Sequence, residues 1–573
     1  MHEVTPTVAV VGDGPAVESV RAALDDVDVP VRKTALDAIA DAQLAVVVGL
    51  AGSDGFREAN DRAREGDTPW IAVEVGGIGG TPVPDLDAAV SVLDPNDGCF
   101  DCLRSRVASV DRETADAPGA DRSAVRVAGA YAGQLAVRAI AGADVTGTVV
   151  EVPYARRELL PAPNCACDPG RDRTIDRSVA TRSLDASIDA AERAVDDRLG
   201  PITAVGEHDS FPAPYYLATM GTTDPFSDAE APRRAAGVDV DWDRAFVKAL
   251  GEALERYSAA IYRDEEFRRA PVDEVDGVSP ADFVRPDDAP DPDAAGSLPW
   301  VEGVDLTIDE STWLPAEFVH FPPPEERFTT PITTGLGLGN DAVEAVLSGL
   351  YETVERDATM LGWYSTFDPL RLTVDDEGFD TLVRRARAED LSVTPLLMTQ
   401  DVDVPVVAVA VHREEWPAFA MGSAADLDAA AAARSALSEA IQNWMELRSM
   451  GREGAADAEG AIARYADFPR EVRSLVDPSG AVPAESVGVV GDLDPTAELD
   501  ALVDRVADAG PTPYAARVTP RDVDAIGFEA VRVLVPTAQP LFVENAFFGE
   551  RARTVPRELG FEPRLDRPFH PYP

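Results

Sequence analysis

Two segments far apart in this chain have nearly the same sequence, and both are predicted to form helices. Leu250–Arg256 reads LGEALER and Leu350–Arg356 reads LYETVER, while Leu437–Asn443, reading LSEAIQN, keeps the same apolar spacing. Residues three and four apart share one face of a helix, so each segment presents its acidic or amide side chains together. The segments lie too far apart for a solenoid repeat. The repetition therefore predicts three helices that converge in space.

Several carboxylates on converging helix faces repel one another unless a cation lies between them. A divalent metal that holds a polyphosphate explains such a cluster, since Mg²⁺ binds through carboxylates, phosphate oxygens and water. The alternative is a solvated helix face in a very acidic protein, which is what a charge pattern most often marks. Because the motif is repeated, we favour the interpretation that these carboxylates bind a metal.

Composition narrows the class of partner. The 573 residues include 103 acidic and 51 basic ones, for a net charge of −52, and the acidic residues are spread along the chain. Such a surface is typical of a protein adapted to molar salt, and it disfavours nucleic acid and anionic membranes as partners. An apolar run of membrane-spanning length and a basic, then apolar, N-terminus are both absent from the sequence, so we expect a cytoplasmic protein.

The chain divides into two folded parts of different class. Apolar strands at residues 7–12, 45–49 and 70–75 alternate with helices and predict an α/β, Rossmann-like parallel sheet within residues 1–170. The glycine turn at Gly12–Gly14 has Val17 where a dinucleotide fingerprint needs its third glycine, which favours a structural sheet over a nucleotide site there. Residues 171–208 are predicted to be a connector, and residues 209–573 a mixed α+β domain.

The four cysteines form two close pairs, Cys99 with Cys102 and Cys165 with Cys167. Four thiolates at this spacing predict a closed, structural tetrahedral Zn²⁺ site that staples the first domain to the connector. Disulfides and a redox Cys-x-x-Cys are the alternatives. The first disagrees with a cytoplasmic protein, and the second leaves the other pair unexplained.

With these motifs in place, residues 209–573 resemble the YcaO superfamily. The resemblance rests on Gly237 with Ala245–Ala259, on Thr334–Asn340 with Glu352–Ala358, and on Gly422–Ala424 with Ala433–Gln442. In that family these helices bind ATP and Mg²⁺, with carboxylates on the metal and arginines facing phosphate. The cofactor-binding residues implied here are Glu252, Glu255, Arg256, Asn340, Glu352, Glu355, Arg356, Glu439 and Gln442. By its spacing, each arginine could instead pair with its own glutamates.

Three signature positions depart from the family pattern. Val238 follows Gly237 where Gly-Lys-Gly is common, and Thr334 precedes Gly335 where asparagine is usual. The third signature often ends Gln-Ser-Arg, whereas here Trp444 occupies the arginine position. Arg448, one turn further on, is the substitute that the sequence offers.

Residues 1–170 are similar to the degenerate E1-like partner domain of azoline-forming YcaO proteins, in which a four-cysteine zinc site is typical. The proline-rich end, Pro568–Pro573, resembles the carboxy terminus that reaches toward the active site in those proteins. The resemblance makes His570 and Pro573 the catalytic candidates at this end. A solvated histidine in an ordinary disordered tail is the alternative.

The resemblance implies ATP-dependent cyclodehydration of a ribosomally made peptide or protein, which gives a thiazoline or oxazoline. No leader-binding module precedes the first strand, so a separate leader-peptide-binding protein is one expected partner, and a dehydrogenase another. The family also allows a homodimer. Two alternatives stay open. One is thioamide formation; the other is a non-catalytic scaffold that binds ATP or a partner.

Overall fold

The N-terminal part of the chain is built on one seven-stranded sheet. The computed structural model describes residues 7–153, 155–457, 461–488 and 493–572. The strand order is β2-β1-β3-β4-β7-β8-β9, in which the first four strands are parallel and the last three antiparallel. These strands are β1 (Val8–Val11), β2 (Val31–Lys33), β3 (Leu44–Leu50), β4 (Trp70–Val75), β7 (Ala88–Leu93), β8 (Thr148–Val152) and β9 (Ala155–Glu158).

The prediction of a parallel sheet is therefore correct for four strands and wrong for three. A parallel return needs a crossover that is long enough to cover a sheet face, usually a helix. The segment after β4 instead forms a small hairpin, β5 (Gly77–Ile78) and β6 (Thr81–Pro82), and leads straight into β7. The chain consequently returns antiparallel at this point.

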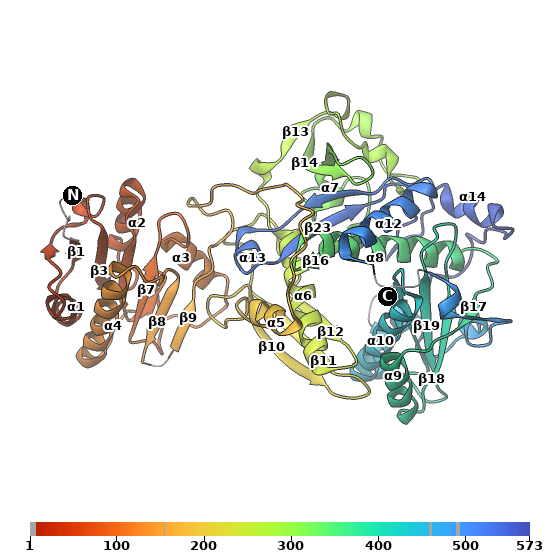
Figure 1. Ribbon diagram of the computed structural model, residues 1–573, viewed down its shortest axis with the longest axis horizontal. Helices are drawn as coiled ribbons and strands as arrows, with labels where there is room; N and C mark the ends of the chain where they lie inside the picture. The colour runs from red at the N-terminus through yellow and green to blue at the C-terminus, as the bar shows by residue number, and fades with distance from the viewer. Residues whose placement is uncertain (1–6, 154, 458–460, 489–492, 573) are drawn as a thin grey trace.

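Helices cover both faces of this sheet (Figure 1). α1 (Pro15–Asp25) and α4 (Arg122–Ile140) bury alanine, valine and leucine side chains against one face. α2 (Gly55–Gly66) and α3 (Phe100–Ala108) bury a second core on the other face. Burial on both faces explains why the central strands read as continuous apolar runs instead of alternating ones.

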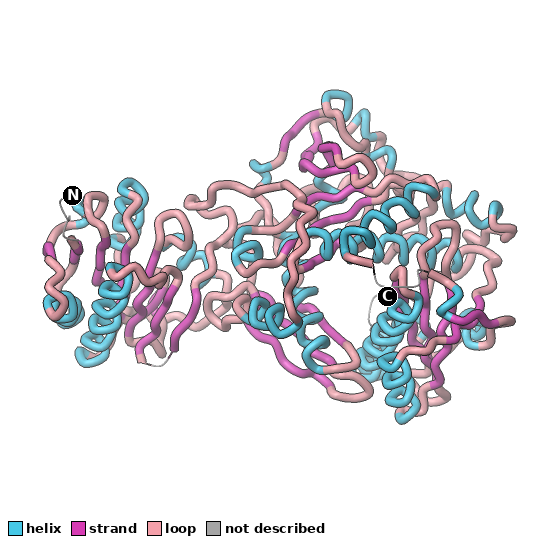
Figure 2. Tube along the Cα trace, viewed as in Figure 1, coloured by secondary structure: helices cyan, strands magenta, loops and turns pink. Residues whose placement is uncertain are grey.

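A long loop then runs from the N-terminal part to the rest of the chain (Figure 2). It leads into α5 (Leu184–Glu192) and an antiparallel three-stranded sheet of β10 (Ile202–Asp209), β11 (Tyr215–Met220) and β12 (Arg234–Val238). Arginines of the loop reach into the C-terminal part; for example, Arg171 donates to the carbonyl oxygen of Ile261 at 2.7 Å. The segment predicted as a connector is thus packed against the C-terminal part.

Two further sheets form the C-terminal part. The first has the order β13-β14-β22-β23-β16, with β15 paired to β14, and the second has the order β20-β19-β18-β17-β21. The first comprises β13 (Arg268–Ala270), β14 (Leu298–Asp305), β15 (Glu310–Pro315), β16 (Leu336–Gly339), β22 (Tyr514–Arg517) and β23 (Glu529–Leu534). The second comprises β17 (Leu370–Thr373), β18 (Ser392–Leu397), β19 (Val406–His412), β20 (Phe419–Ala425) and β21 (Ala481–Pro483).

The three predicted helices are the long ones of this part: α6 (Trp242–Ala260), α8 (Ala342–Trp363) and α10 (Ala429–Asp457). Each packs on the strand before it, and a strand glycine permits the close approach in all three cases. A Cβ on these glycines would lie 2.1–2.4 Å from helix backbone atoms; the pairs are Gly237 with Ala249, Gly337 with Ala345 and Gly422 with Ala440. Shorter helices cover the remaining edges: α7 (Ala316–Val319), α9 (Glu377–Ala388), α11 (Ala461–Tyr465), α12 (Pro495–Asp508), α13 (Arg521–Ala525) and α14 (Arg551–Glu558).

A buried ionic contact joins the N-terminal sheet to the C-terminal part. Arg106 of α3 pairs with Asp522 of α13, and both side chains are fully buried. Tyr257 of α6 donates its hydroxyl to Asp522 at 2.6 Å and lies 3.2 Å from the Arg106 guanidinium. This contact fixes α6 relative to the first domain. Among the described helices, none is long and apolar enough to cross a membrane.

Candidate functional site

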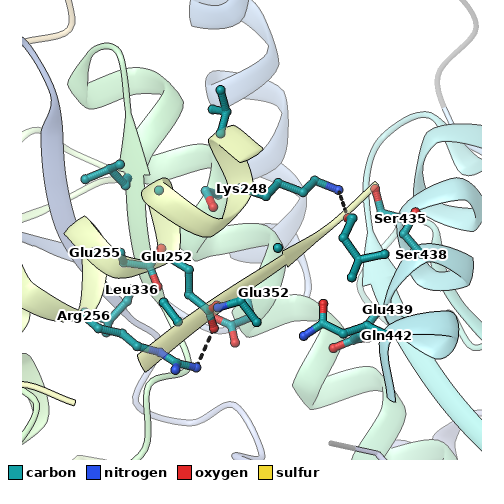
Figure 3. A pocket seen from close by; sticks show the side chains of 18 of the residues that line it. Lys248, Glu252, Glu255, Arg256, Leu336, Glu352, Ser435, Ser438, Glu439 and Gln442 are labelled. Carbon is teal, nitrogen blue, oxygen red and sulfur yellow. Dashed lines mark hydrogen bonds and ion pairs between the residues drawn. The ribbon is translucent and has the colours of Figure 1, made fainter. Parts of the chain in front are cut away.

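The three long helices enclose a cleft of about 1170 Å³, which we call the main cleft. Its walls come from α6, α8 and α10 together with β12, β16 and the end of β20. The structure brings all nine predicted cofactor-binding residues to this cleft: Glu252, Glu255, Arg256, Asn340, Glu352, Glu355, Arg356, Glu439 and Gln442. Eight of them lie on these three helices, which are distant in sequence and adjacent in space (Figure 3).

One local geometry occurs three times in the main cleft. The first glutamate of each of the three repeated motifs accepts a hydrogen bond from a backbone N–H in or beside the strand that precedes the helix. The pairs are Glu252 with Ala236 at 2.6 Å, Glu352 with Gly335 at 2.9 Å, and Glu439 with Ser423 at 2.5 Å. Each bond restrains one carboxylate at the cleft wall, which leaves its other oxygen for further partners.

Two arginines lie among these carboxylates. Arg256 pairs with Glu252 at 2.6 Å, one helical turn away. Arg356 contacts Glu355 at 3.3 Å and Glu352 at 3.7 Å, and it also reaches Glu439 of α10 at 3.9 Å. Pairing of each arginine with its own glutamates, one of the sequence alternatives, is thus present. Arg356 in addition links two of the three helices.

Burial makes ionisation of the glutamates costly. Desolvation, with the nearby Glu352 and Glu252 charges adding to it, raises the pKa of Glu255 to about 8. Desolvation likewise raises the pKa of Glu439 to about 8 although Arg356 opposes it, and it raises the pKa of Glu252 and of Glu355. A desolvated carboxylate cluster of this kind favours a divalent cation, whose charge lets the oxygens ionise. The donor set therefore fits Mg²⁺.

Several further lining residues were not found from the sequence. Lys248 of α6 lines the main cleft (Figure 3) and pairs with Asp239 at 2.6 Å. It is one of only two lysines in the chain, a rarity that could have singled it out. Glu446 accepts a hydrogen bond from Tyr215 at 3.1 Å. Ser435, Ser438 and Asn443 of α10 complete that wall.

Two predicted positions near the cleft have partners of their own. The Asn340 side chain accepts from Ser187 of α5 at 2.8 Å and donates to Glu344 at 2.9 Å, so it ties the loop after β16 to α5. Arg448 was the residue that the sequence offered in place of the missing phosphate-facing arginine. It pairs with Asp209 at 2.5 Å and stacks on Trp444 at 4.7 Å. Arg448 is not among the residues that line the main cleft.

The carboxy-terminal segment is folded, not loose. Trp363 at the end of α8 donates to the carbonyl oxygen of Pro568 at 2.9 Å. His570 is 1% exposed, and its two ring nitrogens face the carbonyl oxygens of Phe542 at 2.8 Å and Tyr572 at 3.1 Å. Burial lowers the pKa of His570 to about 4. Pro573, the other catalytic candidate, lies outside the described residues.

The four cysteines form a second cluster at the edge of the first domain. Their sulfur atoms all lie within 4.8 Å of one another, with Cys99 3.6 Å from Cys165 and Cys102 3.4 Å from Cys167. These separations are too long for disulfides, whose sulfurs are about 2.05 Å apart. They fit a tetrahedral Zn²⁺ with bonds of about 2.3 Å. Arg521 of α13 donates to Cys167 at 3.4 Å, which brings the C-terminal part to this cluster.

Comparison with known proteins gives one family and several relatives. The family described as YcaO cyclodehydratase, ATP- and Mg²⁺-binding, matches residues 236–539. An uncharacterized protein of Methanothermobacter thermautotrophicus is 28% identical over 338 residues, which is 56% of this chain and 85% of that protein. An uncharacterized protein in the tfuA 3′ region of Rhizobium leguminosarum bv. trifolii is 26% identical over 236 residues, or 36% of this chain and 54% of that protein.

Two solved structures share the overall fold. A heterocyclase in complex with substrate and cofactor matches with a TM-score of 0.72 and 20% identity, over 99% of this chain and 84% of that one. The heterocyclase TruD matches with a TM-score of 0.65 and 19% identity, over 97% and 82%. The likeness extends over both the N-terminal sheet and the C-terminal part.

Proposed function

Because this chain belongs to the YcaO family, we propose that it is a cyclodehydratase that uses ATP and Mg²⁺ to form thiazoline or oxazoline from Cys, Ser or Thr in a peptide. One observation carries the proposal. Three helices that are separate in sequence bring the five predicted glutamates into a single cleft, where burial raises the pKa of four of them, Glu252, Glu255, Glu355 and Glu439.

The glutamates on the three helices are proposed to hold Mg²⁺ and, through it, the phosphates of ATP. Glu252, Glu352 and Glu439 each have one oxygen held by a backbone N–H. Arg256 and Arg356 are proposed to exchange part of their present pairing for phosphate oxygens, because a guanidinium fits phosphate as well as carboxylate. Bound Mg²⁺ supplies charge neutralisation and aligns the donor with its acceptor, which is most of what phosphoryl transfer requires.

The proposed reaction starts at a backbone amide. The side chain of a following Cys, Ser or Thr adds to the carbonyl carbon, and the resulting oxyanion accepts the γ-phosphoryl group. Loss of phosphate then leaves a five-membered ring with a C=N bond. The open main cleft suits a nucleotide that must enter and leave, and the neighbouring arginines suit the charge that develops. A ribosomally made peptide or protein is the proposed substrate, with a leader-binding protein or a dehydrogenase as candidate partners.

The N-terminal region is proposed to be an E1-like domain of residues 1–170 that does not itself adenylate substrate. The four parallel strands and the helices on both faces support it. A structural Zn²⁺ on Cys99, Cys102, Cys165 and Cys167 is proposed to hold its end against the connector, 171–208, and the catalytic domain, 209–573. The contact of Arg521 with Cys167 supports that role.

The test is calorimetric binding of ATP with Mg²⁺ in molar KCl. We expect the wild type to bind and Glu355→Gln to bind at least ~100-fold more weakly. Mutation of a residue that only hydrogen-bonds to a metal ligand already lowers metal affinity about 10–100-fold. Glu310→Gln, which removes the same charge from an exposed site on β15, is the control and keeps wild-type affinity. A well-folded wild type that binds no nucleotide would instead favour the scaffold alternative.

A further inference from the structure

A second, smaller cavity adjoins the main cleft, and we call it the side pocket. It has a volume of about 80 Å³, whereas one water needs about 10–15 Å³. Arg356 lines both cavities, so the side pocket begins where the carboxylate cluster ends. Its other polar lining residues include His320, Thr334, Thr353, Arg532 and Gln539. A group held in the side pocket therefore lies next to the proposed phosphate site.

His320 is held in one tautomer. The side chain is 2% exposed, and Nδ1 lies 2.9 Å from the carbonyl oxygen of Ala259. A carbonyl only accepts, so Nδ1 carries the proton and donates it. Burial, with the charges of Arg173 and Arg171 adding to it, lowers the pKa of His320 and keeps the ring neutral. Nε2 therefore presents a lone pair.

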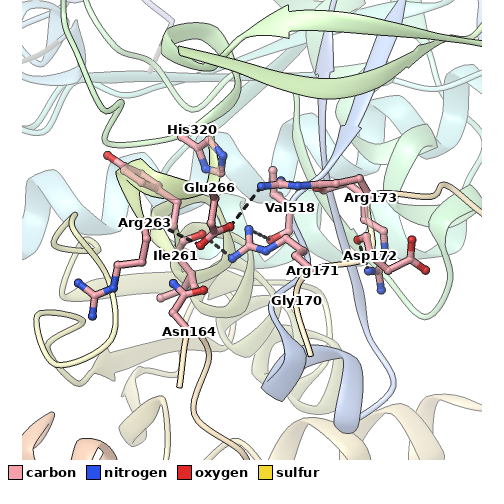
Figure 4. Close-up of polar contacts among 12 residues, drawn as sticks. Asn164, Gly170, Arg171, Asp172, Arg173, Ile261, Arg263, Glu266, His320 and Val518 are labelled. Atoms are coloured by element: carbon pink, nitrogen blue, oxygen red, sulfur yellow. Dashed lines mark hydrogen bonds and ion pairs between the residues drawn. The ribbon is translucent and has the colours of Figure 1, made fainter. Parts of the chain in front are cut away.

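That lone pair is buried without a partner. Among the described residues, none forms a hydrogen bond with His320 Nε2. The rings of Tyr262 and Phe267 pack against the imidazole at 4.7 Å and 5.4 Å and restrain it. Figure 4 shows the polar cluster beside it, in which Arg173 pairs with Glu266 at 3.6 Å. A buried polar atom without a partner is costly and calls for an explanation, of which a catalytic role is one.

Arg532 provides the complementary atom on the same pocket. Its terminal nitrogens donate to the carbonyl oxygens of Ile332 and Thr333, both at 2.9 Å. Its Nε is buried and has no partner within the described part of the chain. His320 Nε2 and Arg532 Nε thus both belong to residues that line the side pocket. The first is a hydrogen-bond acceptor, and the second is a donor on a cationic side chain.

Resting on the function proposed above, we propose that the side pocket takes the Cys, Ser or Thr side chain being cyclised, with His320 Nε2 as its proton acceptor. Arg532 and Arg356 then face the oxygen of the attacked amide. A base, a nucleophile and an oxyanion donor in one pocket are what the addition step requires.

Atoms and electrons balance in this reaction. The S–H or O–H proton goes to His320 Nε2 while the new C–S or C–O bond forms, and the carbonyl π electrons move onto oxygen. That oxygen takes the γ-phosphoryl group and leaves as phosphate. The amide nitrogen loses its proton as C=N forms. The peptide thus loses the elements of one water, which end in phosphate and a released proton, and ATP becomes ADP.

His320 suits this role better than His570. Both ring nitrogens of His570 already face backbone carbonyls, and His570 lines neither cavity. His320 has one nitrogen bound and, within the described residues, one without a partner. A base is oriented in this way by a hydrogen bond on its far side.

The informative variant is His320→Asn. The asparagine amide can keep the donor to Ala259, and no atom replaces Nε2. His412→Asn is the matched control, because His412 also has a ring nitrogen with no partner among the described residues, but lies on β19 and lines neither cavity. Millimolar N-acetyl-Gly-Cys-Gly-amide and its serine counterpart serve as peptide probes, with ATP and Mg²⁺ in molar KCl. The readouts are calorimetric nucleotide affinity and mass-spectrometric loss of water.

We expect His320→Asn to keep wild-type nucleotide affinity while kcat for dehydration falls by about 10²–10⁴-fold, the usual range for a general base. His412→Asn should match the wild type. Equal dehydration by His320→Asn and the wild type would overturn the role of His320 and leave the proposed function standing. A wild type that binds nucleotide but neither binds nor dehydrates the probes overturns the side-pocket assignment. A wild type that binds no nucleotide overturns the proposed function, and the side-pocket assignment with it.

Discussion

The cysteine cluster and the main cleft are both groups of side chains of types that can bind a metal, but they are built in opposite ways. The cysteines come from two short stretches, and their four sulfurs lie within 4.8 Å of one another. The glutamates come from three helices distant in sequence and line a volume of about 1170 Å³. Four like ligands at one centre leave no open position, whereas a wide cleft leaves room for a ligand that exchanges.

On the function proposed above, this difference separates a site that holds the fold from a site that performs chemistry. The closed cluster sits at the seam between the two parts, with Arg521 from the C-terminal part contacting Cys167. The open cleft concentrates carboxylates with raised pKa, which is costly for stability and useful for binding a cation. Variants of the two regions test that distinction, and their expected effects decrease in size from the loss of zinc to a pH dependence.

The largest effect is expected from Cys102→Ser. Removing one of the four proposed zinc ligands should abolish stoichiometric zinc and lower the stability of the first domain by up to about 10 kcal/mol, because zinc binding is folding free energy in closed sites. Elemental analysis and thermal unfolding measure both. Glu439→Gln is the reciprocal control: it should weaken Mg²⁺·ATP binding and retain zinc. Loss of zinc from Glu439→Gln would break the comparison.

An intermediate effect is expected where the two regions meet. Asp522→Asn leaves the Arg106 guanidinium buried without its counter-charge, which should cost about 3–5 kcal/mol in the free energy of unfolding. Asp524→Asn, on the same helix but 59% exposed in its pair with Arg517, is the control and should cost at most about 1 kcal/mol. Denaturant unfolding measures both. Equal costs would show that the buried contact does not hold the two parts together.

The smallest effect is a pH dependence of the ligand-free protein. Glu255 and Glu439 have folded pKa values of about 8, above the ordinary value of 4.5. Between these values the folded state binds more protons than the unfolded state, so stability falls as pH rises from about 5 to 8, by at most about 1.4 kcal/mol per pH unit for each of the two groups. Mg²⁺·ATP should offset that loss increasingly with pH, since it binds the ionised form.

Glu439→Gln should flatten this slope, because an amide does not titrate. Thermal unfolding at a series of pH values in molar KCl, with and without Mg²⁺·ATP, gives both slopes. A wild-type slope of the opposite sign would show that the cleft glutamates are ionised without a bound cation.

Sequence reasoning succeeded where the residues of a site are close together in the chain. The repeated Glu-x-x-Glu-Arg spacing identified α6 and α8, and the close cysteine pairs identified the second cluster. The family assignment is confirmed by the match over residues 236–539. Sequence reasoning failed where the connection between two strands sets the direction of the second one. The prediction of parallel strands was correct up to β4, but the hairpin after β4 makes β7 antiparallel to it.

By itself, the sequence determined which helices carry carboxylates and which residues can hold a metal, because side-chain spacing on a helix is fixed by its periodicity. Only the tertiary structure decided that Arg356 reaches Glu439 of another helix, and that Arg106 meets Asp522 across the domain seam. It also decided that His320 and Arg532 line one pocket. No pattern in the chain marks Arg106 and Asp522, or His320 and Arg532, as neighbours, since burial and long-range packing, not spacing, bring them together.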